Sequence, residues 1–376
     1  MKLQAFFPSC FSASNVVDDG SMDGMDGLTP PSFRAFTYKE MKAATKGFHP
    51  SNKIGEGSFG SVFKGRLQDG TTVAIKVLSV ELESMRGERE FISEITALSH
   101  IKHENLISLL GCCIEGADRF LVYENMENNS IAHAMLGEDQ KRMRFNWEVR
   151  RKIMLGIACG LAYLHEEVEP HIVHRDVKAS NILLDQDFTP KVSDFGLCRV
   201  LRGNITHIST RVAGTLGYLA PEYAISGHLT RKSDVYSFGV LLLEIISGRP
   251  VVAFDLELGE QHLVQKVWEA HKEDELQKIV DPVLSVNDYP AQEAVRFIKV
   301  GLLCVQEAAK TRPRMSMAVK MLTGKVNIDG VKITEPGHIA DLTDIHISSN
   351  KSSMLSVFSK DSDSSGTART PKAAVF

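Results

Sequence analysis

The hydrophobic pattern of this chain changes near residues 123–129, and this change constrains the fold more than any other feature of the sequence. Before it lie strand-like segments at 53–62 and 72–77 and a helical pattern over 85–99. After it come longer helical patterns, at 149–165, 235–247, 264–271 and 295–307. The sequence therefore predicts an α+β fold with a β-rich N-lobe, a mainly helical C-lobe and a cleft between them.

Both ends of the chain lack this regular patterning. Residues 1–47 are expected to form a mostly disordered N-terminal extension, which ends in a short helix predicted over 37–45. From about residue 325 the pattern is lost again, and a Ser/Thr-rich tail over 325–376 is expected to be disordered. The folded domain is therefore expected to span residues 48–324.

Composition excludes several classes of protein. A formal net charge of −4 gives no reason to expect nucleic-acid binding. The six cysteines are irregularly spaced without a zinc pattern, so free thiols in a reducing cytosol are expected. No apolar run approaches the roughly 18 residues of a membrane helix. A cytoplasmic location is expected; Cys10, between Phe7 and Phe11, is a candidate for palmitoylation and peripheral membrane association, and the alternative is an ordinary thiol in a disordered tail.

A glycine-rich loop points to phosphate binding. Glycines let the backbone lie close over phosphates and direct its amide groups toward them. The pattern G-x-G-x-x-G-x-V is weak by itself, because glycine hairpins arise by chance and also mark dinucleotide-binding folds. VAIK at 73–76, predicted on the next strand, favours a nucleotide-binding hairpin, since a dinucleotide loop would open a helix. The candidate nucleotide-binding residues of the loop are Ile54, Gly55, Glu56, Gly57, Ser58, Phe59, Gly60, Ser61 and Val62.

Lys76 in this motif would bring a cation to the α- and β-phosphates of a nucleotide, but its flexible side chain must be held in place. Glu94, eighteen residues later on the predicted helix, can hold it through an ion pair. The alternative for Glu94 is a solvated helix face, which is where glutamates usually lie. Its position beside Ile95, at the edge of the apolar stripe, favours an inward-facing role.

The stretch HRDVKASNILLDQDFTPKVSDFG at 174–196 carries the predicted chemistry. Asp176 would accept or orient the proton of an attacking hydroxyl, and Lys178 would neutralise charge on the transferred phosphoryl group. Asn181 and Asp194 offer hard oxygen ligands that suit Mg²⁺ rather than zinc. These residues at these spacings meet the needs of metal-assisted phosphoryl transfer, in which positioning and charge neutralisation supply most of the catalysis.

With these motifs in order, the chain resembles eukaryotic protein kinases over about residues 48–322. Ala220-Pro221-Glu222 matches the end of the family's activation segment, and Arg312 matches the arginine that pairs with that glutamate. Asp234 matches the buried aspartate that braces the catalytic loop. The resemblance implies a two-lobed protein kinase fold that uses ATP and Mg²⁺.

The closer resemblance is to plant receptor-like kinases, the group related to Pelle and the interleukin-receptor-associated kinases. It is carried by FTYKEMKAATKGF, HENLISLLGCC, HRDVKASNILLD, STRVAGTLGYLAPEY and LTRKSDVYSFGVLLLEIISGRP. Lacking an ectodomain and a membrane helix, the chain resembles a receptor-like cytoplasmic kinase. This implies signalling beneath plasma-membrane receptors, with membrane receptor kinases upstream and proteins as substrates. A truncated membrane-spanning receptor is disfavoured by the Met start and the missing apolar span.

The resemblance also assigns residues near the base of the nucleotide. Tyr123 matches the tyrosine at the back of the adenine pocket, and Met126 is expected on the hinge near the adenine. Asn125 replaces the more usual tyrosine of the hinge, and Cys198 stands where alanine is common. Neither departure removes a catalytic group. Cys198 is either a redox or alkylation point or a plain small side chain.

The resemblance implies serine or threonine as the acceptor, because Lys178 and Gly214-Thr215 are present and tyrosine kinases of the family carry a different catalytic-loop sequence. Arg175 is a cation expected to be buried and to receive a phosphate that orders the activation segment. We predict that autophosphorylation at Ser209 or Thr210 raises activity, while Thr215 has the alternative role of positioning the substrate. The candidate phosphorylation sites are Thr206, Ser209, Thr210 and Thr215.

Two functions compete on this sequence, an active serine/threonine kinase and a non-catalytic pseudokinase scaffold. A pseudokinase usually lacks at least one residue of the reaction centre. The sequence favours catalysis because all five discriminating residues are present, namely Lys76, Glu94, Asp176, Asn181 and Asp194.

Overall fold

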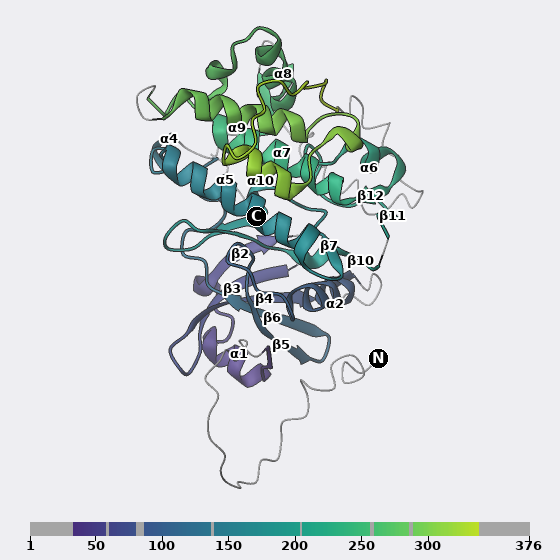
Figure 1. The fold of residues 1–376 in the computed structure, drawn as a ribbon. Coiled ribbons are helices and arrows are strands. Elements are labelled where there is room, and N and C mark those ends of the chain that lie inside the picture. The colour runs from purple at the N-terminus through teal and green to yellow at the C-terminus, as the bar shows by residue number, and fades with distance from the viewer. Residues whose placement is uncertain are drawn as a thin grey trace, which may run out of the picture. The chain divides into compact units, whose positions relative to one another are not determined.

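The structure is a computed structural model that describes residues 33–57, 60–79, 86–136, 139–203, 205–255, 259–285 and 289–337 (Figure 1). The chain divides into two compact units, the first ending at Glu127 and the second beginning at Asn128. The first is built around a sheet and the second mainly of helices, which confirms the predicted fold class and the change of pattern near residues 123–129.

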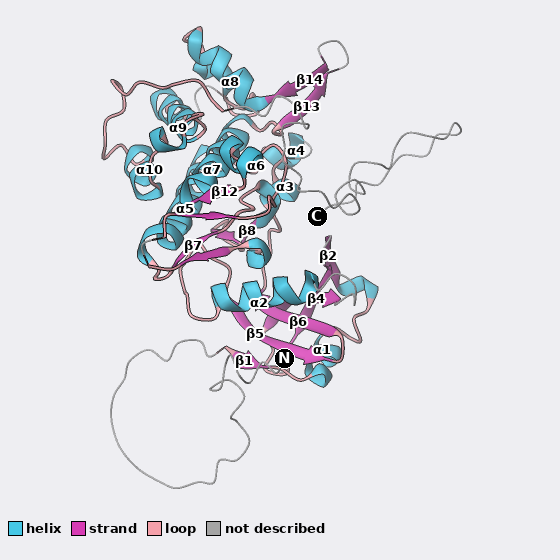
Figure 2. Ribbon diagram, turned by 90° about the vertical axis from the view of Figure 1, so that its right-hand side faces the viewer, coloured by secondary structure: helices cyan, strands magenta, loops and turns pink. Residues whose placement is uncertain are grey.

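A six-stranded sheet forms the framework of the first unit, in the order β1-β5-β6-β4-β3-β2 (Figure 2). Neighbouring strands are antiparallel except β1 and β5, which are parallel. The strands are β1 (Arg34–Ala35), β2 (Lys53–Gly57), β3 (Gly60–Arg66), β4 (Thr72–Ser79), β5 (Leu109–Glu115) and β6 (Asp118–Glu124).

The single strand-like segment predicted over 53–62 is wrong, because the chain reverses there to form the hairpin of β2 and β3. Gly60 has a φ of 144°, and a Cβ at this position would lie 1.8 Å from the carbonyl oxygen of Val77. Only glycine fits so close to the neighbouring strand. Apolar and β-prone residues lie on both sides of the reversal, so the hydrophobic pattern of the sequence did not indicate it.

The helices of the first unit are α1 (Tyr38–Ala44), the 3₁₀ turn Pro50–Asn52 and α2 (Arg86–Leu98). Thr37 starts α1 with a capping box, in which its hydroxyl accepts from the Glu40 amide and its own amide donates to the Glu40 carboxylate. The helices expected over 37–45 and 85–99 are therefore confirmed to within a residue at each end.

The N-terminal segment is part of the folded first unit from residue 33 onward, which corrects the domain boundary expected at residue 48. Phe36 and Met41 are buried in a cluster with Phe120 and Val122 of the sheet. β1 approaches β5 so closely that a Cβ at Gly111 would lie 2.0 Å from the carbonyl oxygen of Arg34. A two-residue strand gives too little alternation to be recognised in the sequence.

The second unit contains α3 (Ile131–Ala134), α4 (Asp139–Arg142), α5 (Trp147–Ala162), α6 (Pro221–Ser226), α7 (Arg231–Ser247), α8 (Leu263–Lys272), α9 (Ala291–Cys304) and α10 (Met315–Leu322). A π-helical turn, Tyr163–Glu167, extends α5. Short 3₁₀ turns lie at Ala179–Asn181, Phe195–Leu197, Leu276–Ile279 and Ala309–Thr311. The four predicted helices are confirmed as α5, α7, α8 and α9, with shifted ends.

Short antiparallel strand pairs connect these helices and hold the loops between them. The pairs are β7 (His171–Val173) with β10 (Arg199–Leu201), β8 (Ile182–Leu184) with β9 (Pro190–Val192), β11 (His207–Ser209) with β12 (His228–Thr230), and β13 (Val252–Asp255) with β14 (Gly259–His262). These three- and four-residue strands carry too few residues to show an alternating pattern in the sequence.

Helix α7 is the centre of the second unit. Every residue from Ser233 to Ser247 is buried, as the apolar pattern over 235–247 predicts. Glycines let α9 approach closely, since a Cβ at Gly239 would lie 2.7 Å from the Cβ of Cys304. The helix ends at Gly248, whose φ of 65° supports a left-handed cap. Because α7 is buried, its polar side chains are held in fixed positions.

The residues after α10 correct the expectation of disorder from residue 325 onward, at least as far as Gly337. Ile328 is buried, and the amide of Gly337 donates to the carbonyl of Val305 at 2.9 Å. Residues 325–337 form no helix, so their contacts left no periodic signal in the sequence.

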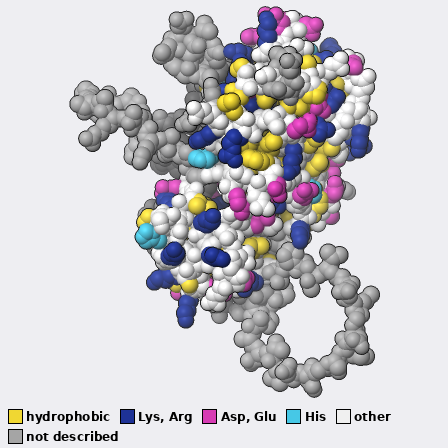
Figure 3. Space-filling model, turned by 90° about the vertical axis from the view of Figure 1, so that its left-hand side faces the viewer, with side chains coloured by type: hydrophobic (Ala, Val, Ile, Leu, Met, Phe, Trp, Pro, Cys, Tyr) yellow, Lys and Arg dark blue, Asp and Glu magenta, His cyan; other side chains and the backbone are white. Residues whose placement is uncertain are grey.

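Charges of both signs are interspersed over the described residues on the face drawn in Figure 3. Such mixing is ordinary for the surface of a globular protein.

Candidate active site

Two candidate phosphate-site residues of the first unit, Lys76 and Tyr123, lie on the face of the sheet that α2 covers. Side chains alternate along β4 and β6, so Lys76 and Tyr123 lie on the face opposite Ile75 and Val122. Lys76 Nζ forms an ion pair of 2.6 Å with Glu94 Oε1 on α2. The structure thus brings together the two residues that the sequence suggests as partners, and Glu94 is fully buried.

Tyr123 has a contact that the sequence did not indicate, because its hydroxyl donates to Glu94 Oε2. Lys76 and Tyr123 therefore bind opposite oxygens of one buried carboxylate. Hydrogen bonds to a charged carboxylate are roughly twice as strong as those between neutral groups. The tyrosine thereby fixes the orientation of Glu94, in addition to the adenine-pocket position that the resemblance implies.

The remaining nucleotide candidates lie along the β2–β3 hairpin and at the end of the first unit. Gly55 is buried, and Ile54 and Glu56 are exposed, with Glu56 in an ion pair of 2.9 Å with Lys53. Ser61 and Val62 on β3 and Met126 near the unit's end are half-buried. Gly57 and Gly60 face each other across the hairpin, and the two residues between them, Ser58 and Phe59, lie outside the described residues.

The second unit places a compact polar cluster around Asp176, which is 5% exposed. Asn181 Nδ2 donates to the Asp176 main-chain oxygen at 2.9 Å and to Oδ2 at 3.0 Å. Lys178 Nζ lies 2.9 Å from Asp176 Oδ2. Asp176 is therefore held by side chains that follow it within five residues.

Thr215 joins this cluster from a distant part of the sequence. Its hydroxyl donates to Asp176 Oδ1 at 2.7 Å and accepts from Lys178 Nζ at 2.9 Å. An aliphatic hydroxyl thus sits against the carboxylate that the sequence assigns to proton transfer and against the lysine beside it. The arrangement shows that the cluster can bind a serine- or threonine-type hydroxyl.

Asp234 on α7 braces the main chain of the catalytic loop. Its carboxylate accepts from the amides of His174 at 2.7 Å and Arg175 at 2.8 Å, and its Oδ2 lies 2.8 Å from His165 Nε2. Complete burial alone would raise the pKa of Asp234, but the hydrogen bond and charge of His165 hold that pKa below its usual range. A charged carboxylate at the centre of the unit therefore fixes the loop.

The loop that carries Asp194 is tied to the catalytic loop. Ser193 donates to the main-chain oxygen of Asn181 from both its amide and its hydroxyl, each at 2.9 Å. Asp194 adopts a φ of 66°, which is rare for a residue with a side chain and typical of functional sites. The segments of Asn181 and Asp194 are thus fixed to each other.

The chemistry of these donors fits Mg²⁺. One amide oxygen and one carboxylate suit an ion that keeps several waters and binds substrate phosphates. Among the described residues, no group of three or more His, Cys, Asp or Glu side chains could hold a metal by itself. Two protein ligands plus phosphate oxygens are what such an ion needs.

Comparison with known proteins agrees with this geometry. Residues 48–322 match the protein kinase domain. The chain belongs to the protein kinase family. Cold-responsive protein kinase 1 of Arabidopsis thaliana is 50% identical over 341 residues, which are 90% of this chain and 85% of that protein. A putative serine/threonine-protein kinase of Helianthus annuus is 64% identical over 221 residues, 59% of this chain and 91% of that protein.

Receptor-like proteins are also similar to this kinase. A probable LRR receptor-like serine/threonine-protein kinase of Arabidopsis thaliana is 49% identical over 324 residues, which are 86% of this chain and 30% of that protein. The kinase therefore spans less than a third of that relative. Within the described residues, no helix has the length and apolar character needed to cross a membrane.

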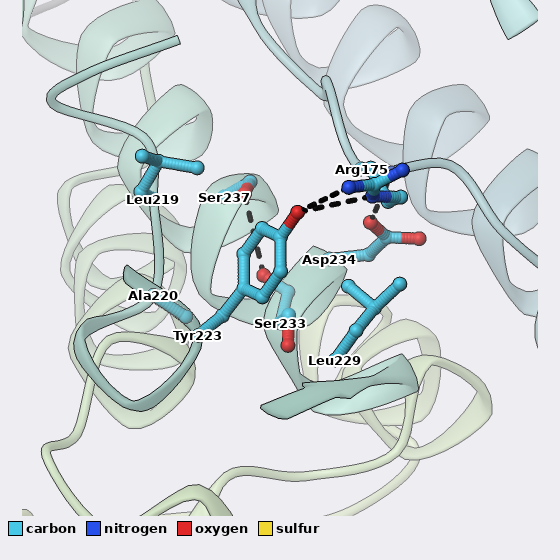
Figure 4. Close-up of a pocket in the computed structure, with 8 residues that line it drawn as sticks. All are labelled: Arg175, Leu219, Ala220, Tyr223, Leu229, Ser233, Asp234 and Ser237. Atoms are coloured by element: carbon cyan, nitrogen blue, oxygen red, sulfur yellow. Dashed lines mark hydrogen bonds between the residues drawn. The ribbon is translucent and has the colours of Figure 1, made fainter. Parts of the chain in front are cut away.

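The kinase holds Arg175 by main-chain oxygens and by the hydroxyl of a tyrosine. Its guanidinium donates to the main-chain oxygens of Leu197 at 3.0 Å and Arg211 at 2.7 Å. It also donates to the Tyr223 hydroxyl at 2.5 Å, a contact drawn in Figure 4. The residue is buried as expected, but main-chain oxygens and a phenol occupy its donors. Tyr223, one residue after Glu222, was missed because nothing in its local sequence marks a partner 48 residues away.

The candidate phosphorylation sites of the kinase lie in different surroundings. Thr206 is exposed before β11, and Ser209 on β11 is exposed opposite His228. The Thr210 amide donates to the main-chain oxygen of Gly227 at 3.0 Å. Thr215 lies in the Asp176 cluster. The first three lie on the strand pair β11–β12 and its edge, five or more residues before Thr215.

A buried glutamate on α7 holds the segment that follows Thr215. The Tyr218 hydroxyl donates to Glu244 Oε2 at 2.5 Å, and the Val251 amide donates to Glu244 Oε1 at 3.1 Å. Burial raises the pKa of Glu244 to about 8, although both hydrogen bonds lower it. Glu244 lies in a strongly apolar run of the sequence, and that contrast was the signal that could have revealed it.

Proposed function

We propose that this kinase is an active enzyme that transfers the γ-phosphoryl group of ATP to serine or threonine hydroxyls of proteins. The observation that carries the proposal is the Thr215 hydroxyl, bound between Asp176 and Lys178 at 2.7 and 2.9 Å. An acceptor hydroxyl needs the same two contacts to lose its proton and to attack. The serine/threonine-protein kinases among its relatives support the same acceptor class.

Each residue of the site has a role in this proposal. Asp176 accepts the proton of the acceptor hydroxyl, and Lys178 neutralises charge on the phosphoryl group as it is transferred. Asn181 and Asp194 would hold Mg²⁺, which when bound neutralises the charge of the phosphates. Asn181 also orients the Asp176 carboxylate through its amide group.

The first unit supplies the phosphate-binding cation in this proposal. Lys76 binds the α- and β-phosphates, while Glu94 and Tyr123 hold it through one carboxylate. The glycines of the β2–β3 hairpin leave main-chain amides free of side-chain bulk for the phosphates. Ile54, Val62 and Met126 would contact the adenine and ribose through apolar surface.

Label transfer from ATP in the presence of magnesium tests the proposal. We expect the purified protein to phosphorylate itself and a generic protein substrate, and Lys76→Ala and Asp176→Asn to lose this activity. Lys39→Ala and Asp187→Asn change exposed residues of the same types and serve as matched controls. Equal label incorporation in all five proteins would support the pseudokinase alternative.

We further propose that the kinase acts in signalling downstream of plasma-membrane receptors, with membrane receptor kinases upstream. The similarity to LRR receptor-like kinases supports this context. The proposed location is cytoplasmic with peripheral association through Cys10, which lies outside the described residues. Fractionation of cells that express wild type or Cys10→Ser tests the anchor, and equal membrane fractions would contradict it.

A further inference from the structure

A segment beyond the matched kinase domain is built into the second unit. We call Thr334–Gly337 the C-terminal strap. The Gly337 amide donates to the Val305 main-chain oxygen at 2.9 Å, and the Glu307 amide donates to the Glu335 oxygen at 3.1 Å. The strap therefore pairs with residues 305–307 in the manner of a short antiparallel strand.

Side chains strengthen this pairing. Buried Gln306 accepts at its Oε1 from the Thr334 amide at 3.0 Å and from the Thr334 hydroxyl at 2.7 Å. Its Nε2 donates to the main-chain oxygens of Leu303 at 3.1 Å and Thr311 at 3.2 Å. One fully engaged amide thus links the strap to both ends of the loop between α9 and α10.

The loop between α9 and α10 also holds Arg312. Arg312 Nε donates to the Gln306 main-chain oxygen at 2.7 Å, and Nη2 donates to that of Glu307 at 3.0 Å. The guanidinium then forms a bidentate ion pair with Glu222, at 2.8 and 2.9 Å. Because Gln306 and Glu307 bind the strap and Arg312 at once, the strap fixes the carbonyls that orient the arginine.

The strap also touches the activation segment directly. A Cβ at Gly337 would lie 2.7 Å from Pro221 Cγ and 3.1 Å from Glu307 Cα, so only glycine fits between them. The Tyr236 hydroxyl donates to the Gly337 main-chain oxygen at 2.8 Å, and the Arg312 guanidinium lies 5.0 Å from the ring centre of Tyr236. Gly337 is therefore enclosed by Pro221, by α7 and by the Arg312 loop.

We propose that the C-terminal strap is a positioning element of the acceptor site, acting through Pro221 and the Glu222–Arg312 ion pair. Thr215, which binds Asp176, precedes Pro221 by six residues in the same segment. Tyr218 between them is held by Glu244. The strap thus fixes the far end of the chain segment that begins at the reaction centre.

This inference rests on the proposed kinase activity and predicts a specific kinetic signature. The hydrogen bonds of the strap go to Val305, Gln306, Glu307 and Tyr236, whereas Asn181 bonds to Asp176 and Ser193. Loosening the strap therefore raises the KM for a peptide substrate or lowers kcat and leaves the KM for ATP within about twofold of wild type. A general loss of structure would change both substrates' parameters.

Gly337→Ala and Gly330→Ala form the first matched pair. The Gly337 variant forces a methyl group against Pro221, whereas a Cβ at Gly330 meets no atom within 4 Å. We expect Gly337→Ala to lose roughly five- to tenfold in kcat/KM for a peptide, less than the hundredfold that a 1 Å misplacement can cost. Gly330→Ala is expected to match wild type.

Amide hydrogen exchange over residues 213–224 gives a readout that does not depend on activity. We expect faster exchange in Gly337→Ala than in Gly330→Ala, with unchanged exchange in α5. Equal exchange in the two variants overturns the proposal, even if their activities differ. An inactive wild-type protein would contradict the proposed function, but the exchange comparison would still decide the inference.

Thr334→Val and Thr334→Ser provide a second pair if Gly337→Ala fails to fold. Valine keeps the size of the side chain but removes the hydroxyl that binds Gln306, whereas serine keeps that hydroxyl. We expect valine to raise peptide KM and exchange over 213–224 and serine to restore both. Failure of serine to differ from valine in both measurements overturns the proposal.

Discussion

Lys76 in the first unit and Asp176 in the second are fixed in different ways. Lys76 pairs with the carboxylate of Glu94, which Tyr123 orients from the opposite side. Asp176 is bound by Asn181, Lys178 and Thr215, and Asp234 fixes the main chain just before it. Lys76 is thus held through an ion pair between a helix and a strand, whereas Asp176 lies in a network of several side chains.

The Lys76 contacts connect a helix with a sheet, whereas the Asp176 contacts form one polar network. The Lys76–Glu94 ion pair joins α2 to β4, so a shift of the helix against the sheet would alter it. The network around Asp176 gives preorganised geometry, which is what proton transfer and charge neutralisation require. Variants of the Lys76 contacts and of the Asp176 network should therefore differ in their effects on activity and stability. The four predictions below run from the largest expected effect to the smallest.

Asp176→Asn should have the largest effect, a loss of roughly 10²–10⁴-fold in kcat, because it removes the group that takes the proton. The amide keeps the size of the carboxylate, so unfolding in urea should remain close to that of wild type. Steady-state kinetics with saturating ATP and peptide measure the loss. Activity within threefold of Asp187→Asn would show that the carboxylate does not act in proton transfer.

Glu94→Gln and Asp234→Asn test the comparison directly. Asp234→Asn removes one partner of a buried charged network and should lower the free energy of unfolding by about 3–5 kcal/mol. Glu94→Gln should mainly raise the KM for ATP or lower kcat, because Lys76 is partly exposed and can be solvated. Urea unfolding and ATP titration of both variants measure this. Similar losses of stability in the two variants would contradict the expected difference between the Lys76 contacts and the Asp176 network.

Glu244 gives a prediction about pH. Its folded-state pKa is about 8, above the ordinary value of 4.5, so the folded state binds a proton that the unfolded state releases. This contribution to stability is complete below about pH 4.5 and is lost as pH rises toward 8, with a slope of up to about 1.4 kcal/mol per pH unit. Urea unfolding between pH 5.5 and 8.5 measures it. Glu244→Gln should flatten the profile relative to wild type, and parallel profiles would contradict the assignment.

The smallest expected effect belongs to the activation segment, because Arg175 is already bound by Leu197, Arg211 and Tyr223. Replacing Ser209 and Thr210 together by alanine should lower activity by several-fold, roughly the 0.5–1.5 kcal/mol of a hydrogen bond or two. Initial rates after preincubation with ATP measure the effect. Thr206→Ala is the control, and an unchanged rate in the double variant would exclude both residues as activating sites.

Residues close in sequence were the easier part to predict. Asp176, Lys178 and Asn181 contact one another within five residues, so their spacing alone nearly defines their geometry. Amphipathic spacing likewise located α2 and marked Glu94 as a residue that could face inward, and a continuous apolar run located α7. In contrast, Tyr223, Glu244 and Gly337 find their partners 48, 26 and 101 residues away.

The sequence by itself determined the fold class and the order of the motifs, and it supplied the candidate residues for binding phosphate, metal and acceptor. The fold class and the candidates follow from local periodicity and from residue types that take part in few kinds of chemistry. Only the tertiary structure decided that the chain before residue 48 extends the sheet, that Thr215 binds Asp176, and that the C-terminal strap encloses Pro221. Such contacts depend on how buried elements pack, because a single hydrogen bond or a glycine without side-chain bulk leaves no repeating pattern in the sequence.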